Sequence, residues 1–237
     1  MTSFDFSGKT IVLTGVGRPG QVGEVVAKAF ADSGAHVALI DRDDQVNARA
    51  EEITRSGGKA SPYLCDLTNS DEVAGVAERI RADSGGAVAA LVNLAGGFAM
   101  SGPVADSDIA VLSKQIAINL TTAYVATRTF LPLVRATRGA IVFFASAAVL
   151  PDGGVKNISG YAAAKAGVLA LMRAVAAEEL GVVRANAVAP TQIRTADNVA
   201  GMGDRAAYVE REAVADTVLF LCSDASRNIT GQAVKLQ

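Results

Sequence analysis

Residues 10–30 read TIVLTGVGRPGQVGEVVAKAF: a short β-branched run, a glycine-rich turn, and apolar residues at three- and four-residue spacing. The run 10–13 is apolar on both faces, as is typical of a strand buried between two layers of helices. The spacing from Val22 to Phe30 predicts a helix that ends near Gly34. The stretch therefore predicts a strand–turn–helix unit, the building block of a parallel α/β sheet.

The same alternation continues to the end of the chain. It predicts further strands at 36–40, 60–65, 88–94, 140–145, 182–188 and 233–236, and helices at 45–55, 70–82, 106–134 with a break, 159–180 and 208–222. No linker or charge block interrupts the pattern, so one domain over 1–237 is expected. The prediction is a single-domain Rossmann fold, a doubly wound parallel seven-stranded sheet with helices on both faces. Its ligands bind at the carboxyl ends of the strands.

The composition excludes several classes of protein. Of 237 residues, 50% are hydrophobic and 19% charged, which is too apolar for a disordered chain. No stretch approaches the roughly 20 unbroken apolar residues of a membrane helix. Lysine plus arginine number 22 and aspartate plus glutamate 24, a formal charge of −2 with no basic run. Neither a membrane nor nucleic acid is therefore an expected partner.

The cysteines and the N-terminus bear on location and metal binding. Cys65 and Cys222 lie far apart without metal-ligand spacing, so no metal site is predicted. The start MTSFDFSGK lacks the apolar core of a secretion signal. Both observations favour a cytoplasmic protein. Since the chain has one histidine, proton chemistry is expected from Tyr, Lys, Asp or Glu.

The glycine-rich turn matches the dinucleotide-binding pattern G-x-G-x-x-G at Gly15, Gly17 and Gly20, and Asp41 follows 21 residues later. Glycines allow close approach to a pyrophosphate, the helix N-terminus supplies N–H donors, and a carboxylate can hold both ribose hydroxyls. The alternative is that the glycines only allow a tight turn, which binds no ligand. The position between strand and helix favours a dinucleotide.

The charges near this turn bear on the choice of dinucleotide. Asp41 would repel the 2′-phosphate of NADP, whereas Arg42 beside it and Arg18 in the turn could attract it. NAD is favoured because the carboxylate occupies the ribose position, and NADP is the alternative.

The segment SGYAAAK, residues 159–165, places Tyr161 and Lys165 four apart on one helical face. An ammonium close to a phenol favours the phenolate, so Tyr161 could exchange a proton with an alcohol or carbonyl oxygen near neutral pH. This spacing alone is common in helices.

When the Tyr–Lys pair is taken together with other motifs, the chain resembles the short-chain dehydrogenase/reductase family over nearly all its length. It is closest in pattern to members similar to 3-oxoacyl-acyl-carrier-protein reductases. The motifs stand in the family's order: the turn at 14–23, CDLT with Asp66, NLAGG at 93–97, INLTTAYVATR with Asn119, IVFFAS with Ser146, the Tyr–Lys pair and APTQIRT at 189–195.

The resemblance implies an NAD(P)-dependent oxidoreductase that interconverts a secondary alcohol and a ketone. Tyr161 would be the general acid/base, and Lys165 would lower its pKa and hold the nicotinamide ribose. Ser146 would hydrogen-bond the reacting oxygen, and Asn119 would retain a water that links Lys165 to solvent. The implied cofactor contacts are Gly15, Gly17, Arg18, Gly20, Gly23, Asp41, Asp66, Leu67, Asn93, Ala95, Gly96, Tyr161, Lys165, Pro190, Ile193 and Thr195.

Three features depart from the family pattern. Gly20 and Gly23 are displaced and Pro19 stands where a glycine is expected, which predicts a wider turn. Ser146 precedes Tyr161 by 15 residues, about two more than usual. The substrate cap, at about 196–211, is short. A short cap implies an open site, or one completed by a neighbouring subunit.

The resemblance also implies a homo-oligomer, a tetramer or dimer, in which helices at 119–134 and 160–180 pair between subunits. The expected small-molecule partner is a carbonyl or alcohol substrate. The alternative is a non-catalytic, regulatory dinucleotide-binding protein, motivated by the altered turn and short cap, which would bind nucleotide without hydride transfer. An enoyl reductase is less favoured because it would use a different Tyr/Lys spacing.

Overall fold

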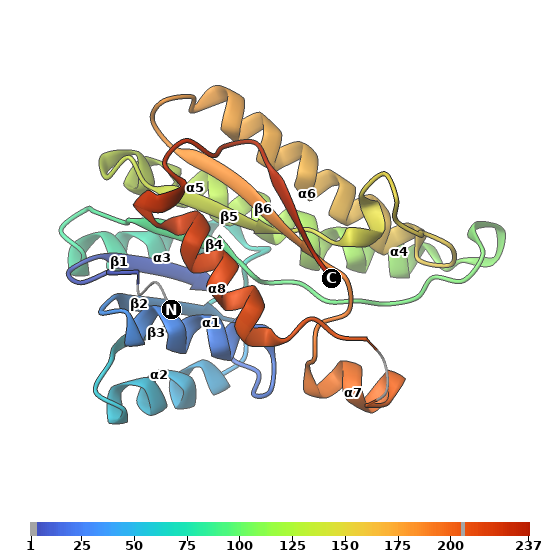
Figure 1. The fold of residues 1–237 in the computed structure, drawn as a ribbon, viewed down its shortest axis with the longest axis horizontal. Helices are drawn as coiled ribbons and strands as arrows, with labels where there is room; N and C mark the ends of the chain where they lie inside the picture. The colour runs from blue at the N-terminus through green and yellow to red at the C-terminus, as the bar shows by residue number, and fades with distance from the viewer. Residues whose placement is uncertain (1–3, 205–206) are drawn as a thin grey trace.

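The computed structural model describes residues 4–204 and 207–237, and its centre is a seven-stranded sheet in the order β3-β2-β1-β4-β5-β6-β7. Every neighbouring pair of strands is parallel. The order reverses direction between β1 and β4, which is the topology of a doubly wound fold. The predicted Rossmann architecture is confirmed (Figure 1).

The first half of the sheet and its helices follow the sequence pattern closely. The elements are β1 (Thr10–Thr14), α1 (Val22–Asp32), β2 (His36–Asp41), α2 (Gln45–Arg55), β3 (Lys59–Leu64) and α3 (Ser70–Asp83).

The second half carries longer helices and a helical segment that the sequence analysis did not predict. Its elements are β4 (Ala90–Asn93), η1 (Val104–Asp106), α4 (Ile109–Gln115), η2 (Ile116–Thr121), α5 (Thr122–Ala136), β5 (Ala140–Phe144), η3 (Ala147–Val149), α6 (Ser159–Glu178), β6 (Arg184–Pro190), α7 (Ala196–Met202), α8 (Arg211–Cys222), η4 (Asp224–Ser226) and β7 (Ala233–Leu236).

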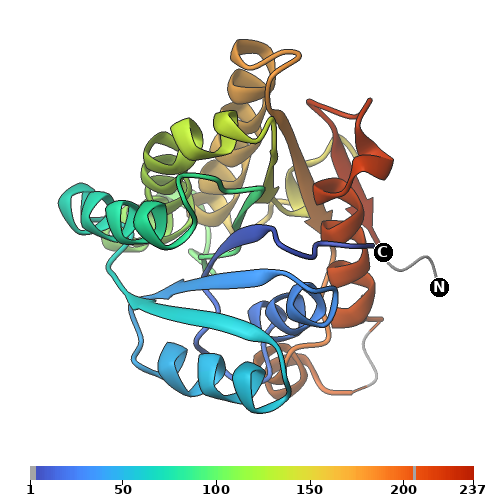
Figure 2. The same ribbon diagram turned by 90° about the vertical axis from the view of Figure 1, so that its left-hand side faces the viewer.

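Two layers of helices bury the two faces of the sheet (Figure 2). Apolar residues of α1, α2 and α8 form one core with Ile11 and Leu13 of β1. Residues of α3, α5 and α6 form the other core with Val12. Successive side chains of a strand point to opposite faces, so the continuous apolar run in β1 supplies both cores.

The break predicted within 106–134 is a change of helix type rather than an interruption. Residues 116–121 form a π-helical segment between α4 and α5, and the helix continues through it. Such widened turns are rare and occur often at functional sites, because they redirect side chains. Here the segment carries Asn119, which is buried.

The cap region contains one helix that was not predicted. Residues 196–202 form α7, which lies apart from the sheet beside the start of α8 (Figure 1). The helix predicted from 208 begins at Arg211 instead, because Val209 pairs with Ile193 in an isolated bridge. Residues 205–206 of the predicted cap lie outside the described residues.

Two helical stretches are long and apolar enough to cross a membrane by length and composition alone. They are Ile109–Ala136 and α6, each with a mean hydropathy of 1.2 over the window tested. Within those windows 28% and 44% of the residues are buried in the fold, and α6 contributes to the core on one face of the sheet. A core helix of a soluble protein has the same composition, so this is weak support for a membrane segment. The expectation of no membrane partner stays a prediction.

Candidate active site at the carboxyl ends of the strands

A cleft of about 370 Å³ lies at the carboxyl ends of the strands, where the topology predicts a ligand. It brings together most of the predicted site residues from segments far apart in the chain. Those that line it are Gly15, Arg18, Gly23, Asp41, Asp66, Leu67, Ala95, Gly96, Asn119, Tyr161, Lys165, Pro190 and Ile193. Gly17, Gly20, Asn93, Ser146 and Thr195 lie outside this lining.

The turn after β1 needs glycine at its first position. Gly15 has φ +74°, and a Cβ there would lie 2.5 Å from the Cα of Ala95. Side chains of L-residues rarely tolerate that conformation, and the backbone contact leaves no room for one. The turn therefore lies directly against the segment that follows β4.

Helix α1 begins at the cleft with free donors. Its N-cap residue, Gln21, makes no side-chain capping hydrogen bond, and Gln21, Val22 and Gly23 line the cleft. The N–H groups in the first turn of a helix have no partners within the helix, and the helix dipole adds positive potential there. This end of α1 is therefore suited to an anionic group such as a pyrophosphate.

Gly17 lies behind the cleft and orients Asp41. The Gly17 N–H donates to Oδ2 of Asp41 over 2.8 Å, and the Asp43 N–H donates to Oδ1 over 3.1 Å. These bonds hold the carboxylate at the end of β2, where it lines the cleft. Asp41 is thus in place to accept hydrogen bonds from ribose hydroxyls.

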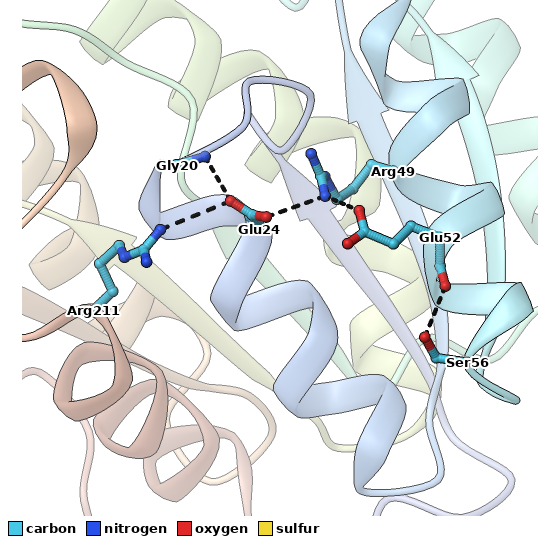
Figure 3. A network of polar contacts seen from close by, with 6 residues as sticks. All are labelled: Gly20, Glu24, Arg49, Glu52, Ser56 and Arg211. Atoms are coloured by element: carbon cyan, nitrogen blue, oxygen red, sulfur yellow. Dashed lines mark hydrogen bonds and ion pairs between the residues drawn. The ribbon is translucent and has the colours of Figure 1, made fainter.

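Glu24 holds the far side of the turn, which explains why Gly20 does not line the cleft (Figure 3). The Gly20 N–H donates to Oε2 of Glu24 over 2.6 Å. Arg49 of α2 donates to Oε1 over 3.2 Å, and Nη1 of Arg211 lies 3.7 Å from Oε2. A residue of the first turn of α1 therefore ties the glycine turn to α2 and α8. Nothing in the sequence pattern singled out Glu24.

The turn is also joined to the cap. Arg18 forms an ion pair with Asp197 of α7 over 2.5 Å, and the Ala196 N–H donates to the Gly20 carbonyl over 3.1 Å. Both charged side chains are more than half exposed, so the ion pair itself contributes little stability. Its effect is positional, because it places Arg18 between the cleft and the cap.

Lys165 is buried at the base of the cleft. Its side chain is 6% exposed, and Nζ donates a hydrogen bond to the Phe144 carbonyl over 2.7 Å. Burial lowers the pKa of Lys165 to about 8, because removal from water disfavours the charged form.

Tyr161 lines the same cleft, with Nζ of Lys165 5.8 Å from its ring centroid. Burial raises the pKa of Tyr161, and a hydrogen bond with Ser146 acts in the opposite direction. The expected lowering of this pKa by Lys165 is not seen in this structure. The ammonium is directed to the Phe144 carbonyl, so burial dominates.

Asn119 secures the loop that follows β4. Its Oδ1 accepts from the Gly97 N–H over 3.2 Å, and Nδ2 donates to the Gly97 carbonyl over 2.9 Å and to the Gln115 carbonyl over 3.1 Å. A Cβ on Gly96 would lie 2.6 Å from Oδ1. Asn119 therefore fits this glycine loop against the π-helical segment. Its proposed water beside Lys165 stays a prediction.

Comparison with known proteins places this arrangement in a family. The family described as enoyl-(acyl carrier protein) reductase matches residues 15–236. The 2,5-dichloro-2,5-cyclohexadiene-1,4-diol dehydrogenase of Sphingobium indicum is 31% identical over 97% of this chain and 96% of its own. The chain belongs to the short-chain dehydrogenase/reductase family. It is accordingly an oxidoreductase that acts on alcohol and carbonyl groups.

Solved members of the short-chain dehydrogenase/reductase family have the same fold. A protein from Beutenbergia cavernae with bound NADP is 32% identical, with a TM-score of 0.87 over 98% of this chain and 96% of that one. A 3-oxoacyl-[acyl-carrier protein] reductase from Brucella melitensis with bound NAD is 28% identical, with a TM-score of 0.83 over 97% and 90%. The family thus binds either dinucleotide.

The residues of this short-chain dehydrogenase/reductase fit such a dinucleotide. The uncapped start of α1 would hold the pyrophosphate and Asp41 a ribose. Asp66 follows β3 with its carboxylate held by Thr68, whose hydrogen bonds lower the pKa of Asp66. A charged acceptor is thus available for an adenine amino group. Among the described residues no cluster of metal-ligating side chains occurs.

Two residues that were predicted to contact the cofactor form hydrogen bonds with other parts of the protein. Asn93 is buried and donates from Nδ2 to Thr127 over 3.1 Å, so it braces the wall of the cleft. Thr195 caps α7 by accepting the Asn198 N–H over 3.2 Å. Neither lines the cleft, although both lie next to segments that do.

Three further residues at the cleft were not found from the sequence. Phe98 packs edge-on against Tyr161, the Phe144 carbonyl binds Lys165, and Asn198 of α7 lines the cleft. The sequence did contain a signal for Phe98, because this residue directly follows the NLAGG motif, which begins at the end of a buried strand. A backbone carbonyl acceptor leaves no mark on a sequence.

Proposed function

We propose that this protein interconverts a secondary alcohol and a ketone, with Tyr161 transferring the proton to or from the reacting oxygen. The arrangement that supports this most is one cleft containing both the free donors of α1 and Tyr161. A dinucleotide held at α1 reaches the tyrosine from one side, and a substrate reaches it from the other. The bound nicotinamide supplies or accepts the hydride.

The chain's own residues orient the substrate and transfer the proton to or from its oxygen. Ser146 lies near enough to Tyr161 to lower the pKa of the phenol, and we propose that a substrate oxygen contacts both hydroxyl groups during proton transfer. Lys165 lies behind the ring with a pKa of about 8, so its charge is retained at neutral pH. In the structure this ammonium is directed to the Phe144 carbonyl, and we propose that it turns to the phenolate that forms when Tyr161 gives up its proton.

We propose NAD as the preferred cofactor. The Asp41 carboxylate is fixed by two backbone N–H groups at the ribose position, where it disfavours a 2′-phosphate. Arg42 also lines the cleft, and Arg18 is paired with Asp197, so the cationic groups near this position are partly neutralised. Saturation binding of NADH and NADPH at equal ionic strength tests the choice, and tighter NADPH binding would refute it.

The experiment that tests the function is a panel of ketones and secondary alcohols, assayed with NADH, NADPH and their oxidised forms at the nicotinamide absorbance band. Turnover of any pair supports the proposal. Saturable nucleotide binding without turnover across the panel would instead support the regulatory dinucleotide-binding alternative.

We also propose a homo-oligomer, a dimer or tetramer, whose subunits pair through the long helices. Ile109, Leu112 and Tyr124 are exposed on the 109–136 helix, which supports this assignment. Light scattering showing only monomer at micromolar concentration would refute it. A cytoplasmic location is likewise proposed, supported by two free, buried cysteines.

A further inference from the structure

The charged and neutral residues of the cleft are segregated. Asp41, Arg42 and Asp66 lie at the carboxyl ends of β2 and β3, at the dinucleotide end, and Arg18 is paired with Asp197 of the cap. Among the described lining residues beyond Thr68, Lys165 is the one charged side chain, and it is buried and bonded to a carbonyl. The described residues at the substrate end therefore provide no free cation that could bind a carboxylate or phosphate of a substrate.

The substrate end instead carries an exposed apolar edge, formed by Phe98 and Met100. Each is 62% exposed. The Phe98 ring centroid lies 5.1 Å from that of Tyr161, with the rings at 79°. Large apolar side chains that stay exposed beside a reactive group are typical of a ligand surface. Covering them with an apolar ligand removes them from water.

This apolar edge is anchored to the helix that carries Tyr161. Asn157 has φ +63°, an uncommon conformation for a residue other than glycine. Its carbonyl accepts the N–H groups of Ser101 over 2.8 Å and Gly102 over 3.1 Å. Ser101 Oγ in turn accepts the Ser159 N–H over 3.0 Å. Since Ser159 begins α6, the position of residues 98–102 is set relative to Tyr161 two residues further on.

We propose that the substrates are uncharged, apolar and ring-sized, namely alicyclic or aryl ketones and the corresponding secondary alcohols, and that Phe98 determines this specificity. The proposal rests on the alcohol–ketone function proposed above. A ring bound edge-on or face-on to Phe98 places its carbonyl toward Tyr161. Keto acids leave their carboxylate without a cation at this end of the cleft, and polyhydroxylated ketones cover Phe98 and Met100 with polar groups, and both effects oppose binding.

The test compares three cyclohexanones that differ in their substituent with a polyhydroxylated ketone. The panel is cyclohexanone, tert-butylcyclohexanone, oxocyclohexanecarboxylate and a ketohexose, each with the wild-type enzyme and saturating reduced cofactor. We expect kcat/KM for tert-butylcyclohexanone to exceed that for the carboxylate and the ketohexose by roughly 100-fold or more, because its alkyl carbons are buried whereas the charged and hydroxyl groups lose water. A preference for the carboxylate or the sugar would overturn the assignment while leaving the alcohol–ketone function intact.

The role of Phe98 is tested by Phe98→Ala, with Phe98→Leu as a conservative variant. The readout is the ratio of kcat/KM for tert-butylcyclohexanone to that for cyclohexanone, because an effect on Tyr161 common to both ketones cancels. We expect Phe98→Ala to lower this ratio about 10-fold and Phe98→Leu to restore most of it. Leu180→Ala removes a comparably exposed apolar side chain at the opposite end of the sheet and should leave the ratio unchanged. An unchanged ratio in Phe98→Ala would overturn its role.

A binding measurement separates the two proposals if no ketone turns over. Saturation-transfer NMR follows each ketone against the enzyme–cofactor complex, without need of hydride transfer. Binding of tert-butylcyclohexanone that is lost in Phe98→Ala, with no turnover, would support the apolar site and refute the alcohol–ketone function. Absence of both binding and turnover of the apolar ketones would refute the apolar site, and the alcohol–ketone function is then decided by the wider panel of ketones and alcohols described above.

Discussion

The two ends of the sheet each carry a hollow, and the larger one is at the end without the chemistry. The hollow at the amino ends has a volume of about 680 Å³, against about 370 Å³ for the cleft at the carboxyl ends. Arg138, Arg184 and Arg227 line the amino-end hollow, so it is strongly basic. Size and charge alone would have placed an anion site there.

The difference lies in which ends of the helices meet each hollow. At the amino end of the sheet helices terminate, and Arg184 donates to the Leu221 and Ser223 carbonyls that end α8. Arg138 likewise donates to the Gly181 carbonyl just after α6. These guanidinium groups satisfy carbonyls and complement helix dipoles. At the carboxyl end α1 begins without a side-chain cap, so its donors are available to a ligand. Backbone groups left unpartnered identify the functional end better than volume does.

The largest effect expected at the carboxyl end follows from Tyr161→Phe. Removing the hydroxyl eliminates the proton donor while the ring still packs against Phe98, so kcat should fall by about 10³-fold. Dinucleotide affinity, measured by calorimetry, should stay within about twofold because the contacts at α1 are unaffected. Turnover close to that of the wild type would show that another group moves the proton.

The burial of Lys165 should be measurable as a pH dependence of the free energy of unfolding. Its folded pKa, about 8, is below the ordinary lysine value of 10.5, so the unfolded chain binds more protons between these values and stability rises with pH across that window. The shift corresponds to about 3 kcal/mol.

The measurement is the difference in unfolding free energy between the wild-type protein and Lys165→Met, taken by urea titration across this window. Taking the difference matters, because burial raises the pKa of Cys65 to about 11 and of Cys222 to about 12, and both act in the opposite direction as pH rises. The difference should shift in favour of the wild type as pH increases. A flat difference would show that the charge of Lys165 is not penalised in the fold.

At the amino end, Arg184→Met should lower the free energy of unfolding without changing the catalytic rate. Its guanidinium is half-buried and donates to the Leu221, Cys222 and Ser223 carbonyls at the end of α8, and all three lose this donor in the variant. We expect a loss of about 2 kcal/mol in the free energy of unfolding. The value of kcat/KM per folded molecule should be unchanged. Arg227→Met is the control, since Arg227 is exposed and makes one long bond to Asp224. A catalytic defect in Arg184→Met would mean that the two ends are coupled.

The smallest effect is expected from Asp41→Asn. The amide keeps the shape and one acceptor but loses the negative charge that opposes a 2′-phosphate. We expect the preference for NADH over NADPH, measured as a ratio of dissociation constants, to fall about 10-fold, or about 1.4 kcal/mol. A preference that does not move would mean that Arg42 or the turn backbone sets it instead.

The sequence predicted the fold because the alternation of buried strands and amphipathic helices is local. Residues 10–13 and the helix from Val22 needed no tertiary context, and the structure confirms both. Most of the predicted site residues were also brought into one cleft, because motifs after parallel strands converge at one edge.

What escaped prediction depends on contacts distant in sequence. Neither the π-helical segment around Asn119 nor the carbonyl acceptor of Lys165 has a signature in residue types. The pKa of Tyr161 was predicted in the wrong direction because spacing on a helix shows proximity to Lys165 but not how deeply the ring is buried. Glu24 seemed an ordinary acidic residue of a first helical turn until Arg49 and Arg211 were seen beside it.

The contacts of the glycine turn bear on how this enzyme can be re-engineered. Arg18 pairs with Asp197 across 179 residues of chain, the Gly20 carbonyl accepts from Ala196, and Glu24 faces Arg211. A turn grafted from a homologue without its own α7 and start of α8 would lose all three contacts at once. In chimaeras, residues 15–24 and 196–211 therefore form one exchangeable module, although most of the chain separates them.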